Sequence, residues 1–166
     1  MKKITLLIIV LSFALSASSQ TIVDTAVSNK NFSTLVTALK AADLVGALSG
    51  DGPFTVFAPN NDAFAKIDSK TLSSLLEPAN VKALSNILTY HVVSGKLLAA
   101  DVANALKAGE GKAKLKSLNG QELTAILKYE KIYLIDAKGG MSEIIATDVI
   151  GTNGVIHVVD TVVMPE

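Results

Sequence analysis

Residues 52–64, GPFTVFAPNNDAF, decide how the rest of the chain is arranged. Residues 54–58 are apolar, aromatic or β-branched, which suits a buried strand, and glycine with proline closes its near end. Pro59 stops the strand, and Asn60 can then accept a backbone N–H as the N-cap of a helix. The strand therefore passes into a helix with almost no loop.

Helical patterns flank this strand on both sides. Residues 21–49 carry apolar stripes at helical spacing, with Asn31 as the expected cap of the second helix and Asp43 as the expected start of a third, short one. Apolar spacing predicts further helices over residues 71–76 and 81–91. The longer of these two delivers a Tyr-His pair to its C-terminal end.

The pattern changes to strands in the second half of the chain. A last helix is expected where Asp101 can act as a cap. Short β runs then follow at residues 113–118, 122–127, 129–136, 144–149 and 155–163. Asn119-Gly120 and Asn153-Gly154 are turn sequences between such runs. Helices first and strands later, with one strand placed early, predict an α+β fold and not a doubly wound parallel sheet.

Three stretches resemble, in the right order, the signatures of the fasciclin-like (FAS1) adhesion domain. They are TVFAPNNDAF at residues 55–64, YHVV at residues 90–93 and TNGVIHVVD at residues 152–160. The resemblance covers about residues 21–165. It implies a β wedge of two small sheets with helices packed along one side, in which the early strand joins the late ones, and it implies an adhesion or binding role.

The resemblance also assigns a structural role to the signature residues themselves. These structural positions are Thr55, Phe57, Pro59, Asn60, Asp62, Phe64, Asn153, Gly154 and His157.

The N-terminus has the pattern of a secretory leader. Lys2 and Lys3 precede an apolar run, and Ala17 with Ser19 are the small residues expected before a cleavage site, so residues 1–19 are predicted to be a signal peptide. The apolar run is shorter than the roughly 20 residues that a membrane-spanning helix needs. We expect residues 20–166 to form one FAS1 domain, secreted to the periplasm or the extracellular space, with no membrane span in the mature chain.

Composition narrows the possible partners. The whole chain has 15 basic and 15 acidic residues and no cysteine. A balanced charge does not favour nucleic acid or an anionic membrane, and the lack of cysteine excludes a disulfide framework. Lys112, Lys114 and Lys116 would share one strand face, either as a solvated edge that resists sheet addition or as a patch for an anion or acidic glycan.

The sequence contains no recognisable catalytic or metal-binding motif. The two histidines lie far apart, with no His-Glu-x-x-His or Gly-x-Ser-x-Gly pattern. His157 lies among valines and isoleucine, which favours a buried structural histidine over a metal ligand or base. His91 can bond the last carbonyls of the preceding helix. We expect no catalytic residue, no metal and no cofactor.

Candidate partner-binding residues come from the family resemblance alone. Animal members have binding assigned to a Tyr-His pair and to an Asp-Ile pair just before the Thr-Asn-Gly signature. The matching positions here are Tyr90 with His91 and Asp148 with Val149. Packing is the alternative role for Tyr90 and His91, and Asp148 is the more transferable recognition residue because a loop carboxylate can bind a partner without remodelling the core.

Two functional hypotheses follow. The first is a secreted, non-catalytic module for adhesion or matrix association that binds a protein or glycan at a cell surface or in a biofilm matrix, with self-association as a possibility. The alternative is a periplasmic or extracellular domain that binds a small molecule such as a lipid, a metabolite or haem in a seam between the helices and the wedge.

Overall fold

A computed structural model describes residues 20–166, so the predicted leader over residues 1–19 lies outside the described residues. The helices are α1 (Ile22–Ser28), the 3₁₀ helix η1 (Lys30–Phe32), α2 (Ser33–Ala41), α3 (Val45–Ser49), α4 (Asn61–Ala65), α5 (Ser69–Leu75), the 3₁₀ helix η2 (Pro78–Asn80), α6 (Val81–Tyr90) and α7 (Ala99–Ala108). The strands are β1 (Phe54–Pro59), β2 (Val92–Ser94), β3 (Lys112–Lys116), β4 (Glu122–Lys128), β5 (Lys131–Ile135), β6 (Met141–Gly151) and β7 (Gly154–Val159). The predicted α+β class is confirmed.

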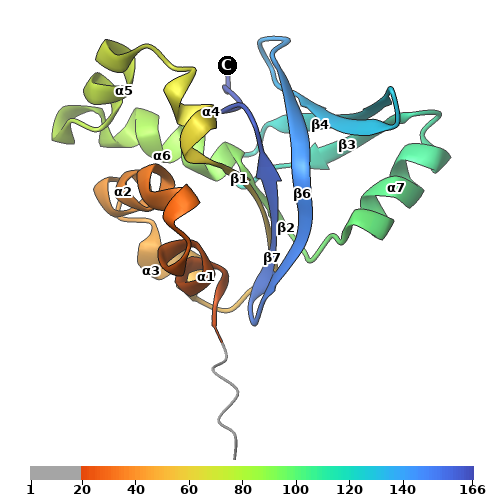
Figure 1. The fold of residues 1–166 in the computed structure, drawn as a ribbon, viewed down its shortest axis with the longest axis horizontal. Coiled ribbons are helices and arrows are strands. Elements are labelled where there is room, and N and C mark those ends of the chain that lie inside the picture. The colour runs from red at the N-terminus through yellow and green to blue at the C-terminus, as the bar shows by residue number, and fades with distance from the viewer. Residues whose placement is uncertain (1–19) are drawn as a thin grey trace, which may run out of the picture.

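The seven strands follow one another in the order β2-β1-β7-β6-β5-β4-β3. β1 runs parallel to β7, and the other neighbouring pairs are antiparallel. β6 pairs with β5 near its start and with β7 along the rest of its length, so it belongs to both halves of the wedge (Figure 1). The early strand joins the late ones, as the resemblance implies.

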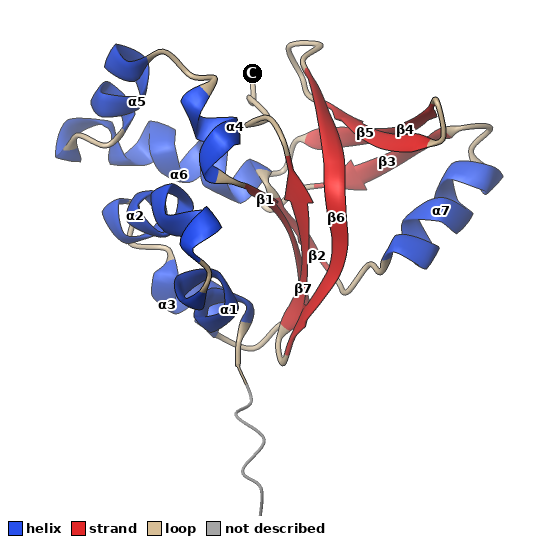
Figure 2. Cartoon of the chain, viewed as in Figure 1, coloured by secondary structure: helices blue, strands red, loops and turns tan. Residues whose placement is uncertain are grey.

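Most helices cover one side of the wedge. Helices α1 to α6 lie together beside β1, β2 and β7, whereas α7 lies on the opposite side of the molecule, near β3 and β4 (Figure 2). α7 is separate because its buried Val102 and Leu106 pack into the core inside the wedge, to which α6 contributes Tyr90, and not into the core that holds α1 to α4. The expected helical layer therefore consists of α1 to α6.

Strand β1 supplies side chains to two hydrophobic cores. Val56 and Ala58 face the helical core with α1, α2 and α6, while Phe57 faces the core inside the wedge with Tyr90 and Val159. Successive side chains of a strand point to opposite faces, so a strand buried on both faces reads as a continuous apolar run. This arrangement explains why residues 52–64 organise the chain.

The structure corrects three predicted helix starts. Asn29, not Asn31, provides the cap, because its Oδ1 accepts the N–H of Asn31 at 3.0 Å and begins η1 directly before α2. Asp43 has a left-handed φ of 56° and lies before the start of α3. Asp101 lies inside α7, and its carboxylate reaches back to the N–H of Leu98 at 2.9 Å.

Candidate recognition site at the bulge of strand β6

Strand β6 is irregular where it passes Asp148. Ala146 pairs with Val158 and Val149 pairs with Ile156, so two β6 residues, Thr147 and Asp148, lie opposite one β7 residue. Asp148 has a left-handed φ of 59°, a conformation that aspartate tolerates better than most residues. The result is a β-bulge that turns the Asp148 N–H away from the regular ladder.

His157 satisfies the amide that the bulge displaces. Its Nδ1 accepts the N–H of Asp148 at 3.3 Å, and its Nε2 lies 2.7 Å from the carbonyl oxygen of Leu97. Because an amide can only donate and a carbonyl can only accept, the proton of the neutral ring is on Nε2. The imidazole is 1% exposed and stacks on Phe57 with centroids 5.6 Å apart. Both ring nitrogens are thus engaged by the backbone, and the structural role predicted for His157 agrees with this geometry.

The Asp148 carboxylate holds the start of α7. Its Oδ1 accepts the N–H of Ala99, the first residue of the helix, at 2.8 Å. A negative charge is favourable there because the first helical N–H groups lack intrahelical partners. The Asp148 side chain is exposed, and within residues 20–166 its Oδ2 accepts no hydrogen bond. One oxygen is therefore positioned by the fold while the other faces solvent.

Thr55, on strand β1, also binds the segment that precedes α7. Its hydroxyl donates to the carbonyl of Gly95 at 2.7 Å and accepts the N–H of Leu97 at 2.8 Å. The residue is fully buried. β1, through Thr55, and β7, through His157, thus hold residues 95–98 against the sheet, so that the bulge and the start of α7 keep a defined geometry.

The stretch of β6 around the bulge is open to solvent. Ile145 is 47% exposed and Ile150 is 59% exposed, and residues 146–148 between them are exposed as well. Val149, by contrast, is half-buried and packs against the helical core. We call Ile145, Thr147, Asp148 and Ile150 the β6 surface. Val149 is a candidate through the family resemblance, and its partner binding stays a prediction. The bulge, which no local sequence pattern marks, leaves Ile150 as the more exposed of the two side chains.

The structure places Tyr90 inside the wedge. The side chain is fully buried, its hydroxyl donates to the Glu122 carbonyl at 2.9 Å, and the same oxygen accepts the Ala137 N–H at 3.0 Å. Burial raises the pKa of this phenol above its ordinary value. The hydroxyl therefore joins α6 to β4 and to the turn that follows β5.

His91 is engaged in a similar way. Its Nδ1 lies 2.8 Å from the carbonyl of Ile87 in the last turn of α6, and its Nε2 accepts the Val163 N–H at 3.1 Å. Burial lowers the pKa of the imidazole to about 4, so the ring is neutral at pH 7. Tyr90 and His91 share no hydrogen-bond partner with Asp148. Partner binding by these two residues stays a prediction, and their contacts agree with the packing alternative.

The Asn153-Gly154 turn is a junction of three segments. Asn153 Oδ1 accepts the N–H of Ile22 at 3.0 Å, and its Nδ2 donates to the carbonyls of Leu48 at 2.8 Å and Gly50 at 2.9 Å. A Cβ on Gly154 would lie 2.2 Å from the Phe54 carbonyl oxygen, so the parallel approach of β7 to β1 needs glycine at this position.

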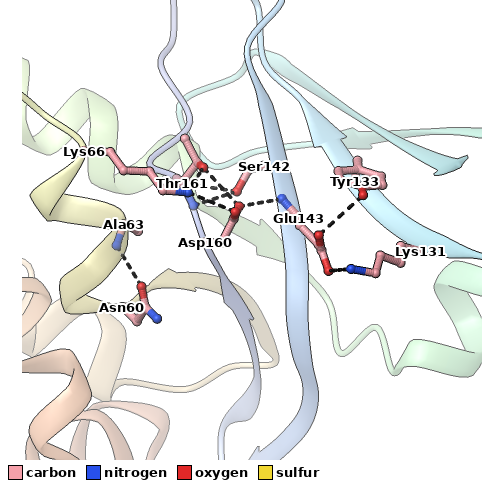
Figure 3. Close-up of polar contacts among 9 residues, drawn as sticks. All are labelled: Asn60, Ala63, Lys66, Lys131, Tyr133, Ser142, Glu143, Asp160 and Thr161. Atoms are coloured by element: carbon pink, nitrogen blue, oxygen red, sulfur yellow. Dashed lines mark hydrogen bonds and ion pairs between the residues drawn. The ribbon is translucent and has the colours of Figure 1, made fainter. Parts of the chain in front are cut away.

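The remaining signature residues hold the other end of β7 (Figure 3). Asn60 Oδ1 accepts the Ala63 N–H at 2.8 Å, as predicted for the N-cap of α4, whose first turn carries Asp62. Lys66 Nζ lies 2.9 Å from Asp160 Oδ2, and Asp160 Oδ1 accepts the Glu143 N–H at 2.8 Å. Burial would raise the pKa of Asp160, but its hydrogen bonds outweigh this effect and lower the pKa. The network joins α4, β7 and β6.

The two phenylalanines and the proline of the first signature are also packed within the fold. Phe64 is buried in the helical core, Phe57 in the wedge core, and Pro59 ends β1 opposite Val159.

No cluster in the described part of the chain has the composition of a metal site. Among residues 20–166, no group of three or more histidine, cysteine, aspartate or glutamate side chains could hold an ion. Within the same residues, no helix is long and apolar enough to cross a bilayer. What the geometry offers is a rigid, partly apolar surface with one accessible carboxylate oxygen.

Comparison with known proteins agrees with this architecture. The family model for the fasciclin domain matches residues 30–165. The chain belongs to the fasciclin domain family. A FAS1 domain pair from the insect cell adhesion molecule fasciclin I shares the fold, with a TM-score of 0.77 at 18% identity over 87% of this chain and 51% of that one. The FAS1 fold inferred from the three signatures is thereby confirmed.

Relatives of this FAS1 protein include bacterial and animal members. Protein sll1483 of Synechocystis sp. is 50% identical over 94% of this chain and 79% of its own length. Human periostin is 37% identical over 82% of this chain but only 15% of its own length. The immunogenic protein MPB70 of Mycobacterium bovis is 30% identical over 83% of this chain and 65% of its own length.

Proposed function

We propose that this protein is an exported, non-catalytic FAS1 module that associates with a protein or glycan at the cell surface or in the extracellular matrix. The leader pattern of residues 1–19 motivates export, and residues 20–166 are proposed to act as one domain. Support for the adhesion class comes from family membership and from the structural match to a domain pair of a cell adhesion molecule.

The observation that carries the proposal is the β6 surface. Ile145 and Ile150 expose apolar area on either side of Asp148, whose Oδ2 faces solvent. Contacts of His157 and Thr55 hold this region in place, so little conformational entropy is lost when a partner binds. A partner with an apolar patch and a hydrogen-bond donor would complement the surface.

The non-catalytic part of the proposal is supported by the two histidines. All four ring nitrogens have backbone partners, so neither histidine is available as a base for a neighbouring nucleophile. The small-molecule alternative has less support, because the apolar space between α1, α2 and the sheet has a volume of only about 20 Å³. That space holds about one water molecule and has no room for a lipid or haem.

Capture of the purified protein on envelope and matrix fractions of the producing cells tests the proposal. Asp148→Asn keeps an acceptor for Ala99 and removes the charge, and Ile150→Thr removes apolar area; we expect each to weaken binding several-fold. Asp62→Asn and Val27→Thr are matched controls, since both side chains are exposed and lie on helices α4 and α1 and not on β6. Wild-type protein that binds no fraction at high micromolar concentration, or equal losses in test and control variants, would overturn the proposal.

A further inference from the structure

The wedge is almost closed by its two edge strands, β2 and β3. They meet at one antiparallel bridge, between Val93 and Ser117, beside which the Leu118 N–H donates to the Val92 carbonyl at 2.8 Å. Beyond this bridge the strands separate and leave a groove of about 550 Å³. The sheet is therefore open on one side of the bridge, where this groove lies between β2 and β3.

The hydrogen-bond alternation of β3 determines which backbone groups face this opening. The Ser117 N–H donates to the Gln121 carbonyl at 3.0 Å, and the Gly111 carbonyl accepts the N–H of Leu127 at 3.1 Å. The backbone N–H and C=O groups of odd-numbered residues in this stretch therefore point toward β4. Alternate residues of an antiparallel strand point the opposite way. The N–H and C=O of Lys114 and the N–H of Lys116 consequently face the groove, and no strand in residues 20–166 pairs with them.

The groove also has an apolar lining and a cationic rim. Leu97, Leu115 and the 43% exposed Leu118 contribute the apolar part. Lys112, Lys114 and Lys116 project from the exposed face of β3. Of these three lysines, only Lys114 forms a salt bridge within residues 20–166, with Glu122 at 2.9 Å. Two of the three ammonium groups are thus free to attract a negatively charged partner.

We propose that this groove binds an extended peptide segment of alternating acidic and apolar residues, which adds to β3 as a further strand. Main-chain bonds to Lys114 and Lys116 supply affinity, the apolar side chains of the peptide enter the groove, and its carboxylates meet the lysines. The site lies at the β3 edge of the sheet, separated from β6 by β5 and β4, and it does not depend on the function proposed for the β6 surface.

Fluorescence anisotropy with a labelled heptapeptide of alternating glutamate and valine tests the site. The unmodified peptide should bind the full-length protein. The same peptide with its edge-facing amides N-methylated, or with lysine in place of glutamate, should bind at least tenfold more weakly. Lys114→Ala keeps the edge N–H and should weaken binding a few-fold, whereas Lys114→Pro also removes the N–H and should weaken it at least tenfold. Lys128→Ala, an exposed lysine on β4, is the control and should bind like the wild type.

Hydrogen exchange keeps the test decisive if Lys114→Pro fails to fold. Bound peptide should slow exchange of the Lys114 and Lys116 amides in the wild-type protein. Unchanged exchange at both amides, or equal binding of the N-methylated and unmodified peptides, overturns strand addition. Loss of affinity in the lysine variants without an effect of N-methylation would show a simple anion patch and would also overturn it.

Discussion

The backbone N–H of Val163 donates a hydrogen bond to Nε2 of His91 across 3.1 Å. This bond joins the residue after α6 to the C-terminal segment that follows β7, and it requires an unprotonated Nε2. Charging the ring would place two donors against each other in a buried site. The stability of the fold is therefore linked to the protonation state of His91.

Acidification should destabilise the protein in a defined window. The pKa of His91 falls from 6.5 in a free chain to about 4 in the fold, so the unfolded state binds the proton first as the pH drops. Stability should be complete above about pH 6.5 and decline toward pH 4, by on the order of 3 kcal/mol. Urea unfolding between pH 7 and pH 4 measures the slope. In His91→Gln, the unfolding free energy should fall less between pH 7 and pH 4, because the contribution of His91 is removed. The same pH dependence in both proteins would contradict the role given to His91.

Thr55→Val should destabilise the segment before α7. The substitution keeps the shape of the side chain but leaves the Gly95 carbonyl and the Leu97 N–H without their partner. Loss of such buried bonds costs about 1–3 kcal/mol. Thermal or urea unfolding reports the loss. Thr55→Ser keeps the hydroxyl and should be clearly less destabilised; the prediction is refuted if serine and valine behave alike.

Two glycines should respond in opposite ways to alanine. Gly154→Ala would place a Cβ 2.2 Å from the Phe54 carbonyl oxygen and should separate β7 from β1, with a loss of roughly 3 kcal/mol or more. Gly46 lies in α3 with nothing within 4 Å of its added Cβ, so Gly46→Ala should stabilise by about 0.5–1 kcal/mol. Melting temperatures of the two variants should move in opposite directions from the wild type.

Replacing Asp160 should destabilise the fold more than replacing Lys66, its partner in the ion pair. Lys66 has a half-exposed side chain, so Lys66→Ala should cost less than about 1 kcal/mol. Asp160→Ala also removes the acceptor of the partly buried Glu143 N–H and should cost about 1–3 kcal/mol. Chemical denaturation of both variants, with the double variant to measure coupling, checks this order. A larger loss for lysine than for aspartate would show that the ion pair dominates.

Local chemistry made much of the first signature predictable. The buried strand over residues 54–58 and the Asn60 cap follow from side chains that act within a few positions of one another. The tight turn at Asn119-Gly120 has the same origin, with Gly120 at a φ of 89°. The cap at Asn29, and the Asp101 carboxylate that accepts the Leu98 N–H from inside α7, show the limit of such rules, because several polar residues near a helix start can each supply a first bond.

The order of helices and strands, the strand-to-helix junction at Pro59 and the family signatures were thus determined by the sequence itself, because each depends on neighbouring residues or on a recurring pattern. Only the tertiary structure decided that Tyr90 and His91 are buried, that Ile150 and not Val149 faces solvent, and that β2 meets β3 at a single bridge. Those features depend on partners distant in the chain: the bulge at Asp148 needs His157 and Ala99, and His91 needs Val163. A local pattern specifies what a residue can bond, whereas packing of the whole chain selects which partner it meets.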